Sequence, residues 1–295
     1  MSVAQSPAES GADGRGRWTT KLTVLLCVAV VALPLVVRQG PREVSQWYLA
    51  AAIRHRATGE QAVAERQIEQ ALRWHPTSVD VLLSDALWLR KNGQGEAALA
   101  RCQQLVEAWP DDPRGYLERS HVLQQIGRAS EAIADWKTLS ALNEQRPFMA
   151  EEQIWNGLAY ARAIANEDLV AGLEDANRAA RGPAPSPEVL DTRGYLYYRL
   201  GRLDEARRDL DEAIARYQAW FNDRKQRLVA QGSAAGLAKL DEQRRSELLR
   251  EAAMGLAVMR YHRALVLDSL GDSVAAEDER KQVRALGFTP DESLF

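Results

Sequence analysis

The chain has 295 residues, 46% hydrophobic and 27% charged, and its 38 Lys and Arg nearly balance its 41 Asp and Glu, giving a net charge of −3. That balance argues against a nucleic-acid partner, which needs a basic surface, and two cysteines cannot build a disulfide scaffold or a zinc site. Few aromatic residues (7%) beside abundant Ala, Leu, Arg and Glu favour helices over strands.

The N-terminal region predicts a disordered tail followed by a membrane anchor. Residues 1–17 are rich in Ser, Gly and charge and poor in apolar side chains. Leu22–Val37 then runs for sixteen residues without a charge. A helix of that length is about 24 Å long, and the flanking Trp18 and Lys21 suit the membrane interface. We therefore expect a single transmembrane helix over 18–38.

Two alternatives to an uncleaved anchor are a cleaved signal peptide and a buried core helix. A cleavage site needs small residues after the apolar run, where Arg38 and Pro41 stand instead. A core helix would be expected to carry a polar face, which this run lacks. The basic residues flanking the run are Arg15, Arg17 and Lys21 before it and Arg38 and Arg42 after it. They weakly favour a cytoplasmic N-terminus with the rest of the chain extracytoplasmic.

The next segment repeats itself every 34 residues. Three columns of small residues share that period: Gly59, Gly93 and Gly127; Ala64, Ala98 and Ala132; Ala52, Ala86 and Ser120. Apolar residues recur at helical spacing on both sides of each Gly. Each repeat is therefore predicted to be two short antiparallel helices that approach closely and are joined by a Gly turn. Pro76 and Pro110 end the first two repeats.

A helix–turn–helix repeat with this period and these columns resembles the tetratricopeptide repeat family. The family's pattern fits six segments: 45–78, 79–112, 113–146, about 152–186, 187–220 and 257–290. The fourth is degenerate, with Asn166 where Gly is expected, so it is either tolerated between good repeats or a flexible point. The resemblance implies an all-α, right-handed superhelical solenoid with repeats 1–3 over 45–146 and repeats 4–5 over 152–220.

An insertion separates the fifth and sixth repeats. Gly201 and Gly271 are 70 residues apart, one period plus 36, and the excess at 221–256 is helix-prone except near its middle. We expect a helical hairpin, which is either a solvated spacer or an arm that binds a partner or a second copy. Trp220 and Phe221 at its root are the candidate contacts of such an arm.

The resemblance also implies a concave groove lined by the first helix of each repeat. The candidate partner-binding residues at the family's inward positions are Arg56, Arg90, Lys91, Arg114, His121, Asn156, Tyr160, Asp191, Tyr195 and Tyr198. Tyr and Arg are favoured at binding hot spots, although Tyr195 and Tyr198 could instead pack between helices. The carboxylate clamp of chaperone-binding members is absent, because Leu49 and Ile53 occupy two of its positions.

No catalytic or cofactor-binding motif occurs in the sequence. The chain is therefore predicted to be a membrane-tethered scaffold, not an enzyme, that binds a protein or peptide through the groove and uses no cofactor or metal. One alternative is a structural envelope protein that forms homo-oligomers through the 221–256 arm. Another is an enzyme with an unrecognised site.

Overall fold

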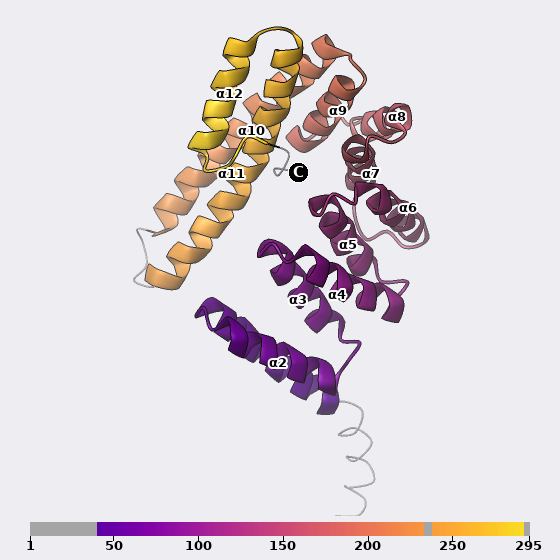
Figure 1. Cartoon of the computed structure of the whole chain (residues 1–295), viewed down its shortest axis with the longest axis vertical. Helices are drawn as coiled ribbons and strands as arrows, with labels where there is room; N and C mark the ends of the chain where they lie inside the picture. Colours follow the sequence, from indigo (N-terminus) through magenta and orange to yellow (C-terminus); the bar gives the residue numbers. More distant parts are fainter. Residues whose placement is uncertain (1–39, 233–237, 292–295) are drawn as a thin grey trace, which may run out of the picture. The chain divides into compact units, whose positions relative to one another are not determined.

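The computed structural model describes residues 40–232 and 238–291, and every regular element within them is an α-helix (Figure 1). These residues fall into two compact units that divide between Asp85 and Ala86. A helix over 40–57 comes first. The helices after it are α2 (Gln61–Trp74), α3 (Val79–Lys91), α4 (Gly95–Ala108), α5 (Pro113–Gln125), α6 (Ala129–Gln145), α7 (Glu151–Ala165), α8 (Leu169–Ala179), α9 (Pro187–Arg199), α10 (Leu203–Gly232), α11 (Ala238–Ser269) and α12 (Ser273–Ala285). The predicted all-α class is confirmed.

Consecutive helices form hairpins closed by residues in the left-handed backbone region. The glycines at the predicted turns all have positive φ: Gly59 (79°), Gly93 (75°), Gly127 (77°), Gly201 (73°) and Gly271 (85°). An L side chain is strained in this conformation, which explains why Gly recurs there with the period of the repeat.

The fourth hairpin, α7–α8, closes with Asn166 in place of glycine. Asn166 has φ 57°, and Asn is the side chain that most readily replaces Gly in the left-handed region at a helix end. The backbone N–H of Glu167 donates to the carbonyl of Arg162 (3.1 Å), as that of Arg128 donates to Leu123 (2.7 Å) one repeat earlier. The degenerate repeat is thus a complete helix pair.

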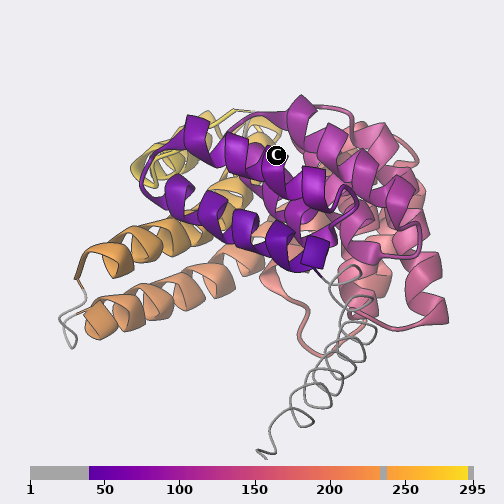
Figure 2. The ribbon, with the colours of Figure 1, turned by 90° about the horizontal axis from the view of Figure 1, so that it is seen from below.

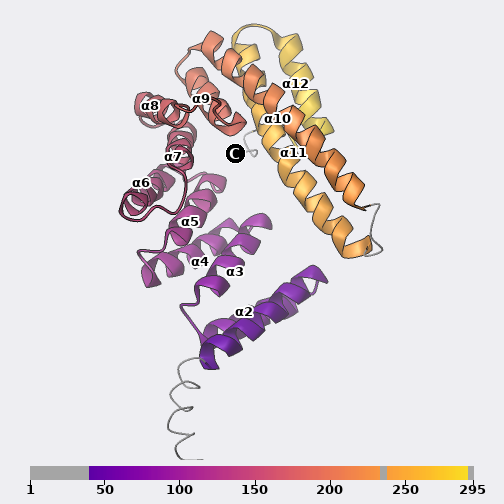
Figure 3. The same cartoon turned by 180° about the vertical axis from the view of Figure 1, so that it is seen from behind.

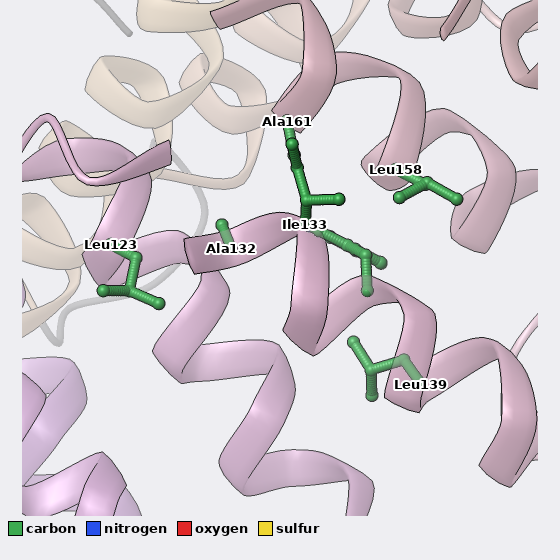
Figure 4. Packing of buried hydrophobic residues seen from close by; sticks show 7 residues of the cluster. Leu123, Ala132, Ile133, Leu139, Leu158 and Ala161 are labelled. Atoms are coloured by element: carbon green, nitrogen blue, oxygen red, sulfur yellow. The ribbon is translucent and has the colours of Figure 1, made fainter. Parts of the chain in front are cut away.

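Small residues bring the two helices of a pair together. Ala86 on α3 and Ala98 on α4 are at most 1% exposed, and Ala206 on α10 is fully buried. A Cβ built on Gly194 of α9 would lie 3.3 Å from the backbone oxygen of Ala206. Larger apolar side chains fill the space between neighbouring pairs, as in the cluster of α5, α6 and α7 shown in Figure 4. Its members are Leu123, Ala132, Ile133, Trp136, Leu139, Leu158 and Ala161.

A second interaction recurs with the repeat: an arginine on the first helix of a pair forms an ion pair with an acidic residue on the second helix. Arg119 Nε donates to Asp135 (2.9 Å), and Arg193 Nε donates to Asp209 (2.6 Å), 16 residues apart in both cases. Arg263 pairs with Glu279, again 16 residues on. The hydrogen bond to Asp209 raises the pKa of Arg193. All three acids are at most 13% exposed, so each pair fixes a helix hairpin from within.

The predicted hairpin extension corresponds to the unusually long helices α10 and α11, of 30 and 32 residues. They run side by side away from the shorter helices of the second unit (Figure 2). Near its root the pair is close, because a Cβ on Gly255 would lie 2.5 Å from the Tyr217 hydroxyl. The turn at 233–237 lies outside the described residues.

The predicted tail at 1–17 and anchor at 18–38 also lie outside the described residues. Within 40–232 and 238–291, no helix is both long enough and apolar enough to cross a membrane. The free thiol of Cys102 on α4 is fully buried, and that burial raises its pKa to about 12. This thiol is therefore chemically inert.

Replacing Ala206 with Leu should destabilise the fold by about 1–3 kcal/mol, because the larger side chain has no room at the contact of α9 and α10. Ala215→Leu, at an exposed position of the same helix, is the matched control and should change stability by less than about 0.5 kcal/mol. Urea unfolding of the full chain in mild detergent measures both. Equal effects would mean that the helix contact is not tight.

Replacing Arg193 with Met should cost about 3 kcal/mol, because it leaves the largely buried Asp209 carboxylate without its partner. The control is Arg227→Met, which breaks an ion pair with Asp223 whose side chains are 75% and 54% exposed. That loss should be under about 1 kcal/mol. The same urea titration compares the two, and a larger loss at Arg227 would refute the structural role of the recurring pair.

Candidate functional site

The first helices of the last three pairs, α7, α9 and α11, contact one another in series (Figure 3). We call their shared surface the first-helix face. Because each hairpin is fixed from within, side chains on these helices are held at defined positions on this face. The predicted groove residues of the second half of the chain all belong to α7 and α9.

A group of polar and aromatic side chains, which we call the Tyr–His cluster, joins these three helices. Its members are Tyr160 on α7, Asp191, Tyr195, Tyr198 and Arg199 on α9, and His262 on α11. Asp191 and His262 Nδ1 are 2.8 Å apart, and both side chains are buried. The rings of Tyr195 and His262 stack with their centroids 4.2 Å apart.

Arg199 and Tyr160 complete the Tyr–His cluster. Arg199 Nη1 donates to the Tyr195 hydroxyl and to the carbonyl oxygen of Ala163 on α7, both at 3.1 Å. Burial, then the negative charge of Asp191, raises the pKa of the Tyr160 hydroxyl well above its ordinary value. Tyr160 is therefore a neutral hydroxyl at any physiological pH.

The cluster divides the predicted tyrosines by accessibility. Tyr195 is 4% exposed, enclosed by His262 on one side and Tyr198 on the other, so its ring packs between helices. Tyr198 is its outer member, stacked on Tyr195 with centroids 5.9 Å apart and only partly buried. Tyr198 is thus more accessible than Tyr195, and its ring remains within reach of a partner, while Tyr160 on α7 is also only partly buried.

Two amide side chains, one on α7 and one on α5, have unsatisfied polar atoms. Among the described residues, neither Oδ1 of Asn156 on α7 nor Nε2 of Gln124 on α5 has a hydrogen-bond partner, although both atoms are buried. A buried amide group without a partner costs free energy.

The predicted basic residues of the front repeats are engaged by acids. Arg56 pairs with Asp85 within the first unit. In the second unit, Arg90 pairs with Glu118 (2.6 Å), and Lys91 pairs with Glu251 on α11 (2.6 Å). Both side chains of the Lys91 pair are more than half exposed, so it contributes little stability. These three basic residues therefore do not form an uncompensated basic surface.

The other predicted site residues have local roles in the structure. Arg114 binds Asp112, whose side chain accepts the backbone N–H of Arg114 (3.0 Å) at the start of α5. His121 lies edge-on to Trp136, and burial, then the positive charge of Arg90, lowers its pKa to about 4. Trp220 on α10 is 45% exposed, while Phe221 packs against the cluster that holds Tyr217 and Leu256.

The sequence offered no indication of His262, which joins α11 to the Tyr–His cluster. His262 is 71 residues from Asp191, so spacing along the chain gave no signal. It shares a face with Asp191 only because repeats five and six stack. Within residues 40–232 and 238–291, no group of His, Cys, Asp and Glu is arranged to hold a metal ion.

A separate hollow of about 540 Å³ lies among α4, α5 and α6. Its wall includes Leu99, Gln103, Arg119 and Asp135. Arg119 is bonded to both Gln103 (2.6 Å) and Asp135, so the main polar groups of this hollow already bind each other. The hollow does not adjoin the Tyr–His cluster and offers no comparable set of available groups.

Comparison with known proteins supports the family resemblance. Residues 187–220, which hold α9 and the first half of α10, match the family model described as tetratricopeptide repeat. A tetratricopeptide repeat protein from Parabacteroides merdae is 14% identical, with a TM-score of 0.52 over 83% of this chain and 94% of that chain. The MamA RS-1 ArsTM double mutant is 14% identical, with a TM-score of 0.50 over 60% of this chain and 96% of that one.

These likenesses concern the fold, because identities this low carry no information about partners. No curated protein matches the sequence. The described chain has the helical fold of tetratricopeptide repeat proteins, and its fifth repeat matches the model of that family.

Proposed function

We propose that this protein is a membrane-tethered adaptor that binds a segment of another protein on its first-helix face and performs no catalysis. The observation that carries the proposal is the Tyr–His cluster. Its buried contacts hold α7, α9 and α11 together, while Tyr198 stays accessible. Rigid aromatic side chains on a preorganised surface bind with little loss of conformational entropy.

The chemistry of the face favours a peptide over a small charged ligand. Tyr198 supplies apolar area with a polar tip, and Asn156 on α7 carries an unsatisfied amide oxygen. A polypeptide in extended or helical form carries both apolar side chains and backbone hydrogen-bonding groups, so it suits this combination. The paired Arg90 and Lys91 do not single out an acidic ligand.

The tether is the second part of the proposal. The apolar run at 22–37 would hold the repeats at one membrane, with the N-terminus cytoplasmic and the repeats extracytoplasmic. Confinement at the membrane raises the effective concentration of a membrane-associated partner, so a modest affinity for the face suffices.

Self-assembly through the long hairpin is the alternative, favoured by the exposure of Trp220 (45%) and Met254 (42%) on α10 and α11. Aromatic and Met side chains are enriched at protein interfaces. In this alternative the second copy contacts the hairpin, and the first-helix face binds no partner.

The test is to cross-link the tagged full-length protein in its own membrane, solubilise it gently and identify what co-purifies. Tyr198→Ala should reduce recovery of a stoichiometric partner at least about tenfold, because it removes an accessible aromatic residue of the face. The matched control is Tyr197→Ala. Tyr197 is also partly buried and packs against the same two core clusters, but it lies beside Arg202 and not Tyr195.

Equal loss from both variants would mean that the effect is on folding and not on recognition. Recovery of the bait alone, with unchanged behaviour of Tyr198→Ala, would contradict the adaptor proposal and favour self-assembly.

A further inference from the structure

Trp220 and Arg224 form an aromatic and basic site on the surface of α10. Trp220 is 45% exposed, and the guanidinium carbon of Arg224 lies 5.4 Å from the centroid of its indole ring. The ring of Tyr217, nearly one turn earlier, lies against the same indole with centroids 5.0 Å apart. These contacts place the three side chains in one row along the helix, at intervals of three and four residues. We call Trp220 and Arg224 the hairpin site.

The guanidinium of Arg224 is not satisfied within the structure. Its Nε atom is buried without a hydrogen-bond partner, and its terminal nitrogens form no ion pair with any acid of residues 40–232 and 238–291. Arg162 on α7 also has a buried Nε without a partner, but it pairs with Asp175 through Nη1. A buried charged donor without an acceptor costs free energy, so Arg224 gains more from an incoming acid than a paired arginine does.

The hairpin site lies on the part of α10 that extends beyond the start of α9. Arg216 Nη1 donates to the carbonyl of Pro185 (3.1 Å), just before α9 begins. Since α10 packs against α9 and runs back along it after a short turn, Trp220 and Arg224 lie about 6 and 12 Å past that level. Phe221, in the same stretch, packs against the core cluster shared with α11. The site is therefore an open surface on a helix that is held in place.

The charges around the hairpin site suit a single carboxylate. Burial, then the negative charge of Glu188 at the start of α9, raises the pKa of Tyr217 to about 12, and the positive charge of Arg224 opposes this shift. Glu188 is thus near, but it forms no ion pair with Arg224. The next arginine, Arg227, is already paired with Asp223 (2.9 Å). Phosphate groups are bound by clusters of arginines, whereas one guanidinium matches one carboxylate.

We propose that the hairpin site binds an acidic residue of a partner protein, with the carboxylate on Arg224 and a flanking apolar side chain on the Trp220 ring. The inference rests on the proposed function only in that the partner is a protein, and it adds a contact outside the first-helix face. Trp and Arg are enriched at binding hot spots. A second copy fits less well, because a symmetric contact centred here would bring two unpaired guanidinium groups together. A partner held at both surfaces binds more tightly than at either one.

The test is photo-cross-linking of the tagged full-length protein in its own membrane, with a photoreactive amino acid in place of Ala219, an exposed residue beside Trp220. We expect an adduct with a different protein, whose linked segment, mapped by mass spectrometry, contains Asp or Glu beside an apolar residue. Arg224→Gln and Trp220→Ala should each lower the adduct yield at least about tenfold, because they remove the charged donor and the aromatic surface. The matched control is Arg227→Gln, which removes an arginine that already has a partner and should leave the yield unchanged. Circular dichroism checks that each variant is folded.

A photoreactive amino acid at position 198 separates this inference from the proposed function. Adducts from position 198 and none from position 219 would overturn the hairpin site and leave binding on the first-helix face standing. Adducts from position 219 that depend on Arg224, with none from position 198, would support the hairpin site and refute binding on that face. Three results at position 219 would overturn the proposal: a yield that Arg224→Gln does not change, a linked segment without Asp or Glu, or an adduct only with a second copy of the chain. No adduct from either position would refute both proposals.

Discussion

The close contact of small residues within each helix pair is the constraint on which this structure depends. Ala86 and Ala98 share one buried cluster, and Ala206 lies against Gly194, so the two helices of each pair approach closely. The left-handed turn makes the hairpin short, and the recurring Arg–acid pair, such as Arg193 with Asp209, holds it from within. Stability in such an array comes from these units and their nearest-neighbour interfaces.

Because the rigid hairpins stack in order, residues that are distant in the sequence lie beside one another on one face. His262 meets Asp191 across 71 residues, and Arg199 reaches the backbone of α7, because repeats four, five and six stack in order. In the resulting Tyr–His cluster Asp191, Tyr195 and His262 are buried, whereas its other members, Tyr198 among them, are partly exposed. The face thereby gains a rigid base and an accessible Tyr198, which is the arrangement a binding surface needs. The same stacking explains why the basic residues of the front repeats are compensated: Arg90 lies against Glu118 of the next repeat.

Much of the fold could be predicted from the sequence because it depends on local conformational and packing requirements within each repeat. Positive φ demands Gly at each turn, close approach demands Ala or Gly, and both requirements recur with the period of the repeat. Asn166 breaks the glycine pattern in the sequence. It nevertheless forms a regular turn, because Asn also adopts the left-handed backbone conformation. The Arg–acid pairs, such as Arg119 with Asp135, also recur with the repeat. They could have been found by comparing charged columns as well as small ones.

The candidate site was less predictable because it depends on contacts between repeats. Family positions nominated Tyr195 and Tyr198 equally, and only the stacking of His262 on Tyr195 shows that one is enclosed and the other accessible. Likewise, Lys91 was a reasonable groove residue by position, while its pairing with Glu251 joins segments 160 residues apart. No local pattern encodes such a contact.

The most direct test of the account is site-specific photo-cross-linking of the full-length protein in its own membrane. A photoreactive amino acid at position 198 samples the first-helix face, and one at position 208, exposed on the second helix of the same repeat, samples the opposite side. We expect a discrete adduct with a different protein from position 198 and none from position 208. Adducts with only a second copy of the chain, or equal labelling from both positions, would contradict it.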